Sequence, residues 1–132
     1  MENHFENFIY LVQRHSLNEV STPHAVSTSE RYYYEILSSI KKHYRTITLA
    51  EISAKMHLSK QYLCRVIKTC TDMSFSDLLS AEKISKVKDY LNETDLSLEK
   101  IAELTGFSCA SYLSRVFKAS EGISPSEYRE IE

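Results

Sequence analysis

Two stretches of the chain repeat nearly the same pattern of apolar and polar residues. YLCRVIKTCTDMS occupies residues 62–74 and YLSRVFKASEGIS occupies residues 112–124, with the same residue at six of the 13 aligned positions. In both stretches apolar side chains recur at i, i+3 and i+4, which is the spacing of an amphipathic helix. The repeat therefore predicts two equivalent helices, each with one buried face and one face in solvent.

The residues on each face of the two helices follow from this spacing. The buried faces are predicted to hold Leu63, Val66, Ile67 and Cys70 in the first helix and Leu113, Val116 and Phe117 in the second. The exposed positions of the first are Lys60, Gln61, Cys64, Arg65 and Lys68. Those of the second are Ala110, Ser111, Ser114, Arg115 and Lys118. Both exposed faces carry an arginine at the same place in the repeat.

Hydroxyl residues mark the starts of the other helices. Ser27 with Glu30, and Thr48 with Glu51, have the spacing of capping boxes. Further N-terminal caps are predicted at Ser59, Ser97 and Ser108, a long helix is predicted after Ser74, and Ser124, Pro125 and Glu127 are predicted to open a last short helix. These signals predict a short helix before each repeated helix and a long helix of about 18 residues between the two pairs.

The composition favours a fold built from helices alone. Of 132 residues 42% are apolar, and two Gly and two Pro leave few turn-forming residues for a sheet.

No apolar run approaches the roughly 20 residues that cross a bilayer, and the first residues lack the features of a signal peptide. Three cysteines form no CxxC pair, and the five histidines lack metal-ligand spacing. We therefore predict an all-α cytoplasmic protein with free thiols and without a metal or cofactor.

The charge of the chain is unevenly distributed. The net charge is −2, but residues 45–71 contain five basic residues and one acidic residue, a local charge of +4. Binding to an anion depends on where the charge lies and not on its sum. The first repeated helix therefore lies in a segment that attracts anions.

Each short helix, turn and repeated helix together have the pattern of a helix-turn-helix unit. The second helix of such a unit enters the DNA major groove and presents its outer residues to the base edges. A guanidinium at Arg65 or Arg115 can donate two hydrogen bonds to guanine or bind a phosphate. The connecting helix is about 27 Å long, whereas successive major grooves on one DNA face are about 34 Å apart. We therefore expect bent DNA or incomplete docking of one unit.

Residues 47–129 resemble the DNA-binding domain of the AraC/XylS family of bacterial transcription activators. The most specific part is IAELTGFSCASYLSRVFKASEGISPSEYR, which is similar to the signature of the family's second unit. The resemblance implies seven helices, two helix-turn-helix units and a long linker helix. It also implies a regulator in the nucleoid that binds double-stranded promoter DNA as a monomer or weak dimer, contacts RNA polymerase and activates transcription.

The resemblance also implies roles for individual residues. The base-reading residues would be Gln61, Cys64, Arg65, Ala110, Ser111, Ser114 and Arg115, and the phosphate-binding residues would be Lys60, Lys68 and Lys118. The sequence departs from the family pattern at four positions. His57 and Asp72 replace glycines, Lys83 replaces an arginine and Ile67 replaces a phenylalanine. We expect the turns at His57 and Asp72 to be strained or differently shaped, although His and Asp tolerate a left-handed backbone better than most residues.

Other functions and a domain division remain open. Residues 30–132 are predicted to form the DNA-binding domain. Residues 1–29 are predicted to form an amphipathic helix and a polar linker. This segment is interpreted as the remnant of a missing sensing domain, as part of a small stand-alone regulator, or as a dimer contact. A helical protein-interaction module is the alternative function. Cys109 near a helix start also suggests a redox switch. Enzyme activity is not expected, because no catalytic constellation is present.

Overall fold

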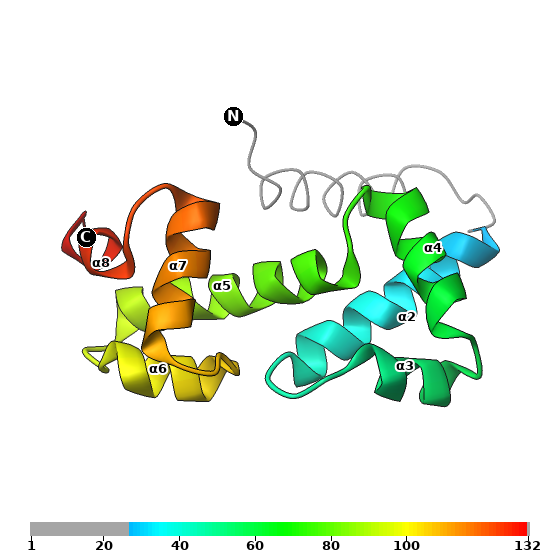
Figure 1. The fold of residues 1–132 in the computed structure, drawn as a ribbon, viewed down its shortest axis with the longest axis horizontal. Helices are drawn as coiled ribbons and strands as arrows, with labels where there is room; N and C mark the ends of the chain where they lie inside the picture. The colour runs from blue at the N-terminus through cyan, green and yellow to red at the C-terminus, as the bar shows by residue number, and fades with distance from the viewer. Residues whose placement is uncertain (1–26, 132) are drawn as a thin grey trace.

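The structure is a computed structural model that describes residues 27–131, and these residues form seven helices and no strand (Figure 1). The helices are α2 (Thr28–His43), α3 (Leu49–Met56), α4 (Lys60–Thr71), α5 (Phe75–Glu93), α6 (Leu98–Thr105), α7 (Ala110–Glu121) and α8 (Pro125–Ile131). None of these helices is long and apolar enough to cross a membrane. The predicted all-α class and helix order are confirmed.

The predicted amphipathic helix near the N-terminus lies outside the described residues. Helix α2 begins at Thr28, and its N-cap Ser27 forms the predicted reciprocal capping box with Glu30 at 3.1 Å in both directions. The domain boundary at residue 30 remains a prediction.

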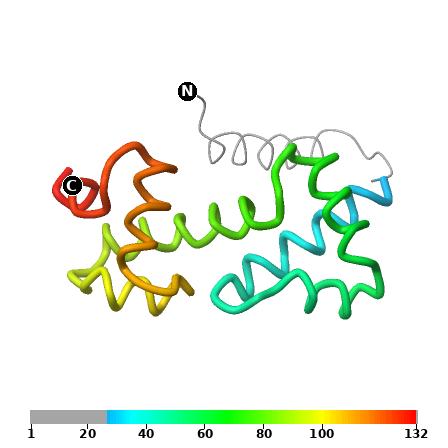
Figure 2. The backbone as a smooth tube through the Cα atoms, in the orientation of Figure 1, coloured from blue at the N-terminus to red at the C-terminus, as the bar shows by residue number. Residues whose placement is uncertain are grey.

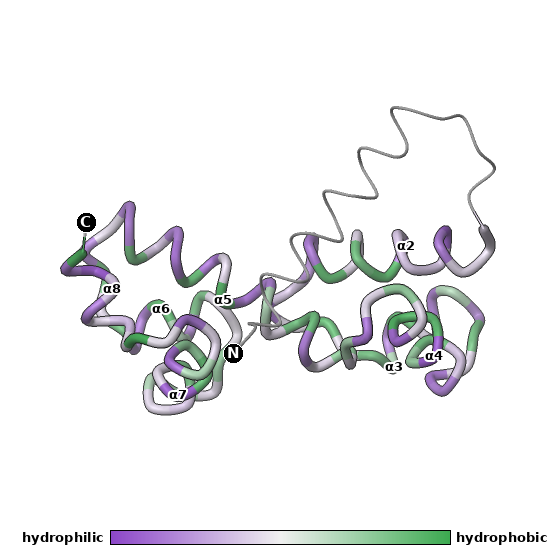
Figure 3. Tube along the Cα trace, turned by 90° about the horizontal axis from the view of Figure 1, so that it is seen from above, coloured by the Kyte–Doolittle hydropathy of each residue, from purple (hydrophilic) through white to green (hydrophobic). Residues whose placement is uncertain are grey.

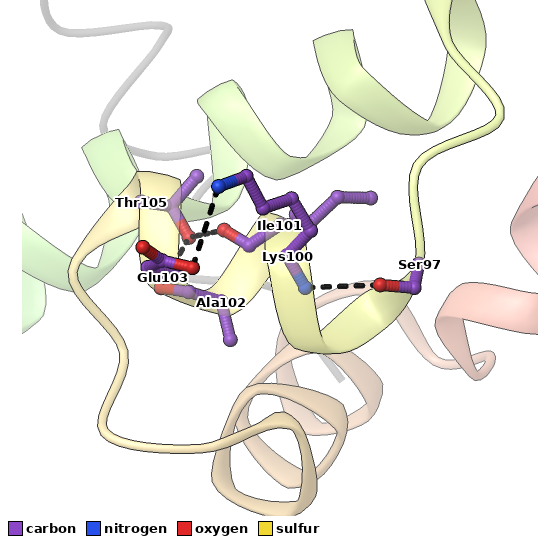
Figure 4. Close-up of polar contacts among 6 residues, drawn as sticks. All are labelled: Ser97, Lys100, Ile101, Ala102, Glu103 and Thr105. Atoms are coloured by element: carbon purple, nitrogen blue, oxygen red, sulfur yellow. Dashed lines mark hydrogen bonds and ion pairs between the residues drawn. The ribbon is translucent and has the colours of Figure 1, made fainter.

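Hydroxyl caps begin the short helices as predicted. Thr48 accepts a hydrogen bond from the backbone N–H of Glu51 at 3.2 Å, although no hydrogen bond from the Thr48 N–H to the Glu51 carboxylate completes a capping box. Figure 4 shows the start of α6, where Ser97 accepts from the Lys100 N–H at 3.2 Å. Each such bond satisfies one of the N–H groups that a helix leaves unpaired at its first turn.

The predicted cap at Ser108 is wrong. Helix α7 begins one residue later, with Cys109 at the N-cap and no side-chain hydrogen bond to close its first turn. Three residues separate α3 from α4, whereas four separate α6 from α7. In the alignment of the two repeats, Cys109 occupies the place of the capping Ser59. The longer turn therefore places Ser108 before the cap.

Two hydrophobic cores lie at opposite ends of the molecule, and α5 contributes to both (Figure 2). Its first half buries Leu78 and Ala81 against α2, α3 and α4. Its second half buries Ile84, Val87 and Leu91 against α6 and α7. Each helix-turn-helix unit thus has its own core, and one continuous helix joins them.

Candidate nucleic-acid interface

Helices α4 and α7 occupy equivalent places in the two halves of the molecule. In Figure 1, α3 and α6 lie along the lower edge, and α4 and α7 rise from them on either side of α5. Seen from above, α4 and α7 lie toward one edge of the molecule, and α2 lies toward the opposite edge (Figure 3). The two helices therefore present their outer faces on a common side.

Burial of one face fixes which side chains each helix presents to solvent. In α4, Leu63, Val66 and Ile67 are buried as predicted, and Cys70 is half-buried. In α7, Leu113 and Phe117 are fully buried, and Val116 is half-buried. The outer faces are therefore held in one orientation by packing, which pre-organises them for contact with a ligand.

The predicted reading residues of α4 all lie on its exposed face. The exposed side chains are those of Lys60, Gln61, Cys64, Arg65 and Lys68. The Ser59 hydroxyl caps this helix by accepting from the backbone N–H of Tyr62 at 3.1 Å. Packing and capping thus place the N-terminal half of α4, the part that enters a major groove in this motif, at the surface.

The predicted reading residues of α7 are less uniformly exposed. Ser111, Arg115 and Lys118 are exposed, whereas Ala110 and Ser114 are half-buried. The exposed and half-buried residues share one side of the helix, as their spacing predicted. The deeper residues offer a methyl and a small hydroxyl group, which are suited to apolar contact and short-range hydrogen bonding.

Tyr112 belongs to this surface, although the sequence reasoning left it out. Its side chain is 43% exposed, and the guanidinium carbon of Arg115 lies 5.5 Å from its ring centroid, in the range of a cation–π contact. The signal in the sequence was the i, i+3 spacing of the two residues. Tyr62, at the same place in α4, is half-buried and packs against Tyr32, with ring centroids 5.9 Å apart. The equivalent tyrosines of α4 and α7 therefore have different surroundings.

The cations of both outer faces are available to an anionic ligand. Among residues 27–131, Lys60, Arg65, Arg115 and Lys118 form no ion pair. Lys68 donates to the backbone carbonyl of Asp72 at 3.2 Å and forms no ion pair within that range either. Side chains that are not neutralised by carboxylates can displace counterions from a polyanion.

The exposed thiols lie at the same surface. Cys64 is on the outer face of α4, and Cys109 is the N-cap of α7. The nearby backbone N–H of Tyr112 lowers the pKa of the Cys109 thiol, because the positive end of its dipole favours the thiolate. No group of three or more metal-binding side chains is present in the described part of the chain.

A family model described as a helix-turn-helix domain matches residues 52–131, which is more than half of the chain. The chain belongs to the AraC/XylS family. The matched range begins in α3 and ends with α8, so it covers most of the first helix-turn-helix unit, the linker helix and the whole second unit. These residues form an AraC-type DNA-binding domain of the kind found in transcriptional regulators.

Individual relatives agree with this assignment. The HTH-type transcriptional regulator YfiF of Bacillus subtilis (strain 168) is 33% identical over 101 residues, which are 73% of this chain and 32% of YfiF. The chain thus spans about a third of the length of this relative. The C-terminal domain of AraT, a response regulator from Geobacillus stearothermophilus, is 30% identical with a TM-score of 0.74, covering 80% of this chain and 89% of that one.

The fold also matches a protein crystallised with DNA. The DNA-binding domain of AdpA, a global transcriptional factor solved in complex with a target DNA, superimposes with a TM-score of 0.68 at 20% identity. The match covers 74% of this chain and 89% of that domain. At this identity the likeness shows the shared fold.

Proposed function

We propose that this AraC/XylS chain is a sequence-specific transcriptional activator that inserts α4 and α7 into successive major grooves of promoter DNA. The observation that carries the proposal is the pair of equivalent helices, each packed on its own core and presenting an exposed arginine on a common side of the molecule. A helix of this kind fits the major groove of B-DNA, which is about 12 Å wide. Two of them on one side can engage one face of a duplex.

The proposal assigns different tasks to the two kinds of exposed residue. Base edges would be read by Gln61, Cys64 and Arg65 on α4 and by Ala110, Ser111, Ser114 and Arg115 on α7. Phosphates would be bound by Lys60, Lys68 and Lys118, which add affinity without sequence preference. The half-buried Ala110 would contribute apolar contact, for instance with a thymine methyl.

The proposal extends to assembly and partners. Two reading helices in one chain let a monomer bind an asymmetric site, because the second half-site does not need a second copy of the protein. Activation would then proceed through contact with RNA polymerase beside the promoter.

Alanine at either reading arginine tests the proposal. We expect Arg65→Ala and Arg115→Ala each to weaken binding by about 1 to 3 kcal/mol, because each removes a bidentate donor. The measurement is fluorescence anisotropy with labelled duplexes from upstream of the protein's own gene and its neighbours, across a salt series. Lys118→Ala should instead weaken all sequences similarly and reduce the salt slope by about one.

An arginine outside the reading helices supplies the control. Arg31 is exposed on α2, and Arg31→Ala should leave the affinity for the preferred duplex unchanged. Equal losses in all three arginine variants would contradict base reading by α4 and α7. Binding that does not respond to salt would instead favour a protein-interaction module, since docking of proteins need not release counterions.

The length of the linker helix predicts a bent complex. Helix α5 has 19 residues and is therefore about 28 Å long, shorter than the roughly 34 Å between successive major grooves. We expect the duplex to bend toward the protein, at a deformation cost of about 1 to 6 kcal/mol. A circular-permutation gel assay measures this bend. A straight duplex with both grooves protected would exclude it.

A further inference from the structure

Gly106 follows the last residue of α6 and Gly122 follows the last residue of α7, and both glycines have φ of 84°. In the first unit the same two places are held by His57 and Asp72, with φ of 57° and 65°. The first unit therefore forms both left-handed turns without glycine. The φ of 84° lies beyond the left-handed range that other residues adopt, so the backbone favours glycine at both places and only their surroundings distinguish the two.

The surroundings of the two glycines are different. A Cβ on Gly106 would lie 2.4 Å from the carbonyl oxygen of Arg45 and 3.0 Å from the Cα of Arg45. A Cβ on Gly122 would meet nothing within 4 Å. Gly106 therefore makes a close backbone approach that no residue with a Cβ can make, whereas Gly122 does not.

The close approach joins the two halves of the molecule. Arg45 lies in the loop between α2 and α3, and Figure 1 shows this loop opposite the turn between α6 and α7. The backbone N–H groups of Thr46 and Ile47 both donate to the carbonyl of His43, which ties this loop to the end of α2. The atoms in question belong to the backbone and cannot move aside as a flexible side chain would.

Lys83 of the linker helix completes the junction. Its Nζ donates to the carbonyl of Gly106 at 3.0 Å and lies 5.5 Å from the ring centroid of Phe107. Burial lowers the pKa of this half-buried lysine. The turn of the second unit thus contacts the linker helix on one side and the first unit on the other.

We propose that Gly106 is a positioning residue, because its missing side chain lets the second unit dock against the Arg45 backbone. This docking contact and the hydrogen bond from Lys83 to the Gly106 carbonyl together set the placement of α7 relative to α4. Without the contact, α5 would be the main connection between two separately packed units. A Cβ would have to open the contact from 2.4 Å to the 3.4 Å of ordinary packing, a shift of about 1 Å. The consequence for DNA, which rests on the proposed function, is that Gly106 determines the spacing between half-sites.

Asparagine at each glycine separates close approach from backbone strain, because asparagine tolerates a left-handed backbone but has a Cβ. Amide residual dipolar couplings in one aligning medium report the relative orientation of the two units in the whole chain, without DNA. We expect couplings of wild type and Gly122→Asn to fit one arrangement, and those of Gly106→Asn to require a different or broader one. Equal behaviour of the two variants would overturn the proposal.

A second variant decides the matter if Gly106→Asn does not fold. Lys83→Met removes the hydrogen bond to the Gly106 carbonyl and leaves the glycine in place, and its couplings should require an orientation of the two units that differs from that of the wild type. Unchanged couplings in Lys83→Met would then overturn the proposal.

Selection from a random duplex library tests the consequence for DNA. We expect wild type and Gly122→Asn to enrich the same half-site spacing, and Gly106→Asn to enrich a different or relaxed one. The same spacing in all three proteins would overturn the link to DNA spacing. Failure of the wild type to enrich any two-part site would contradict the proposed function, whereas the couplings would still test the junction.

Discussion

Replacing Phe117 by alanine should lower the free energy of unfolding by about 3 to 5 kcal/mol. The side chain is fully buried at the centre of the second core, where its ring contacts Tyr128 edge to face with centroids 5.5 Å apart. Truncation removes this apolar area from the core and leaves a cavity that the helices can fill only in part. Small domains are stable by about 5 to 15 kcal/mol, so the loss is a large share of the total. Urea unfolding followed by circular dichroism measures it.

An exposed apolar residue provides the control for the loss of stability in Phe117→Ala. Ile131 is 72% exposed, and Ile131→Ala should change the stability by less than about 0.5 kcal/mol. A loss below about 1 kcal/mol in Phe117→Ala would contradict the packing of α7 on the second core. Phe117 and Arg115 lie on opposite faces of the same helix, so the core variant should also weaken DNA binding through the loss of an ordered α7.

Much of the fold could be predicted because its causes are local. The spacing of Leu63, Ile67, Leu113 and Phe117 identified the buried faces, and each of these residues is fully buried. A helical period together with a capping hydroxyl is enough to place a helix and its inner side, because both signals act within one or two turns. The exposed face of α4 then followed as the complement of its buried face.

The features that the sequence did not predict depend on residues far apart or on small differences between the repeats. Nothing near Gly106 in the sequence indicates that Arg45, 61 positions earlier, will contact it. The start of α7 was misplaced because Ser108 is a better cap than Cys109, and the longer turn overrode that preference. The contact of Tyr112 with Arg115 also depends on a rotamer, which spacing alone does not determine.

Ionisation of Tyr33 should make the protein lose stability between pH 10 and pH 12. The side chain is 1% exposed in the first core, and burial raises its pKa from 10.0 to about 12, since the phenolate loses its hydration there. The unfolded chain therefore releases this proton at a lower pH than the folded chain does. The contribution is fully present below pH 10 and disappears as the pH rises toward 12, a total of roughly 3 kcal/mol.

Substitution by phenylalanine isolates this contribution from that of the other tyrosines and lysines. Urea unfolding at a series of pH values from 9 to 12 should show a decline that is shallower by roughly 3 kcal/mol in Tyr33→Phe than in the wild type. Tyr112→Phe is the matched control, because Tyr112 is 43% exposed, and it should keep the decline of the wild type. If Tyr33→Phe declined as steeply as Tyr112→Phe, the phenol of Tyr33 would have to reach water in the folded state. Helix α2 would then not be packed on α4 in the way that buries Tyr33 in the first core.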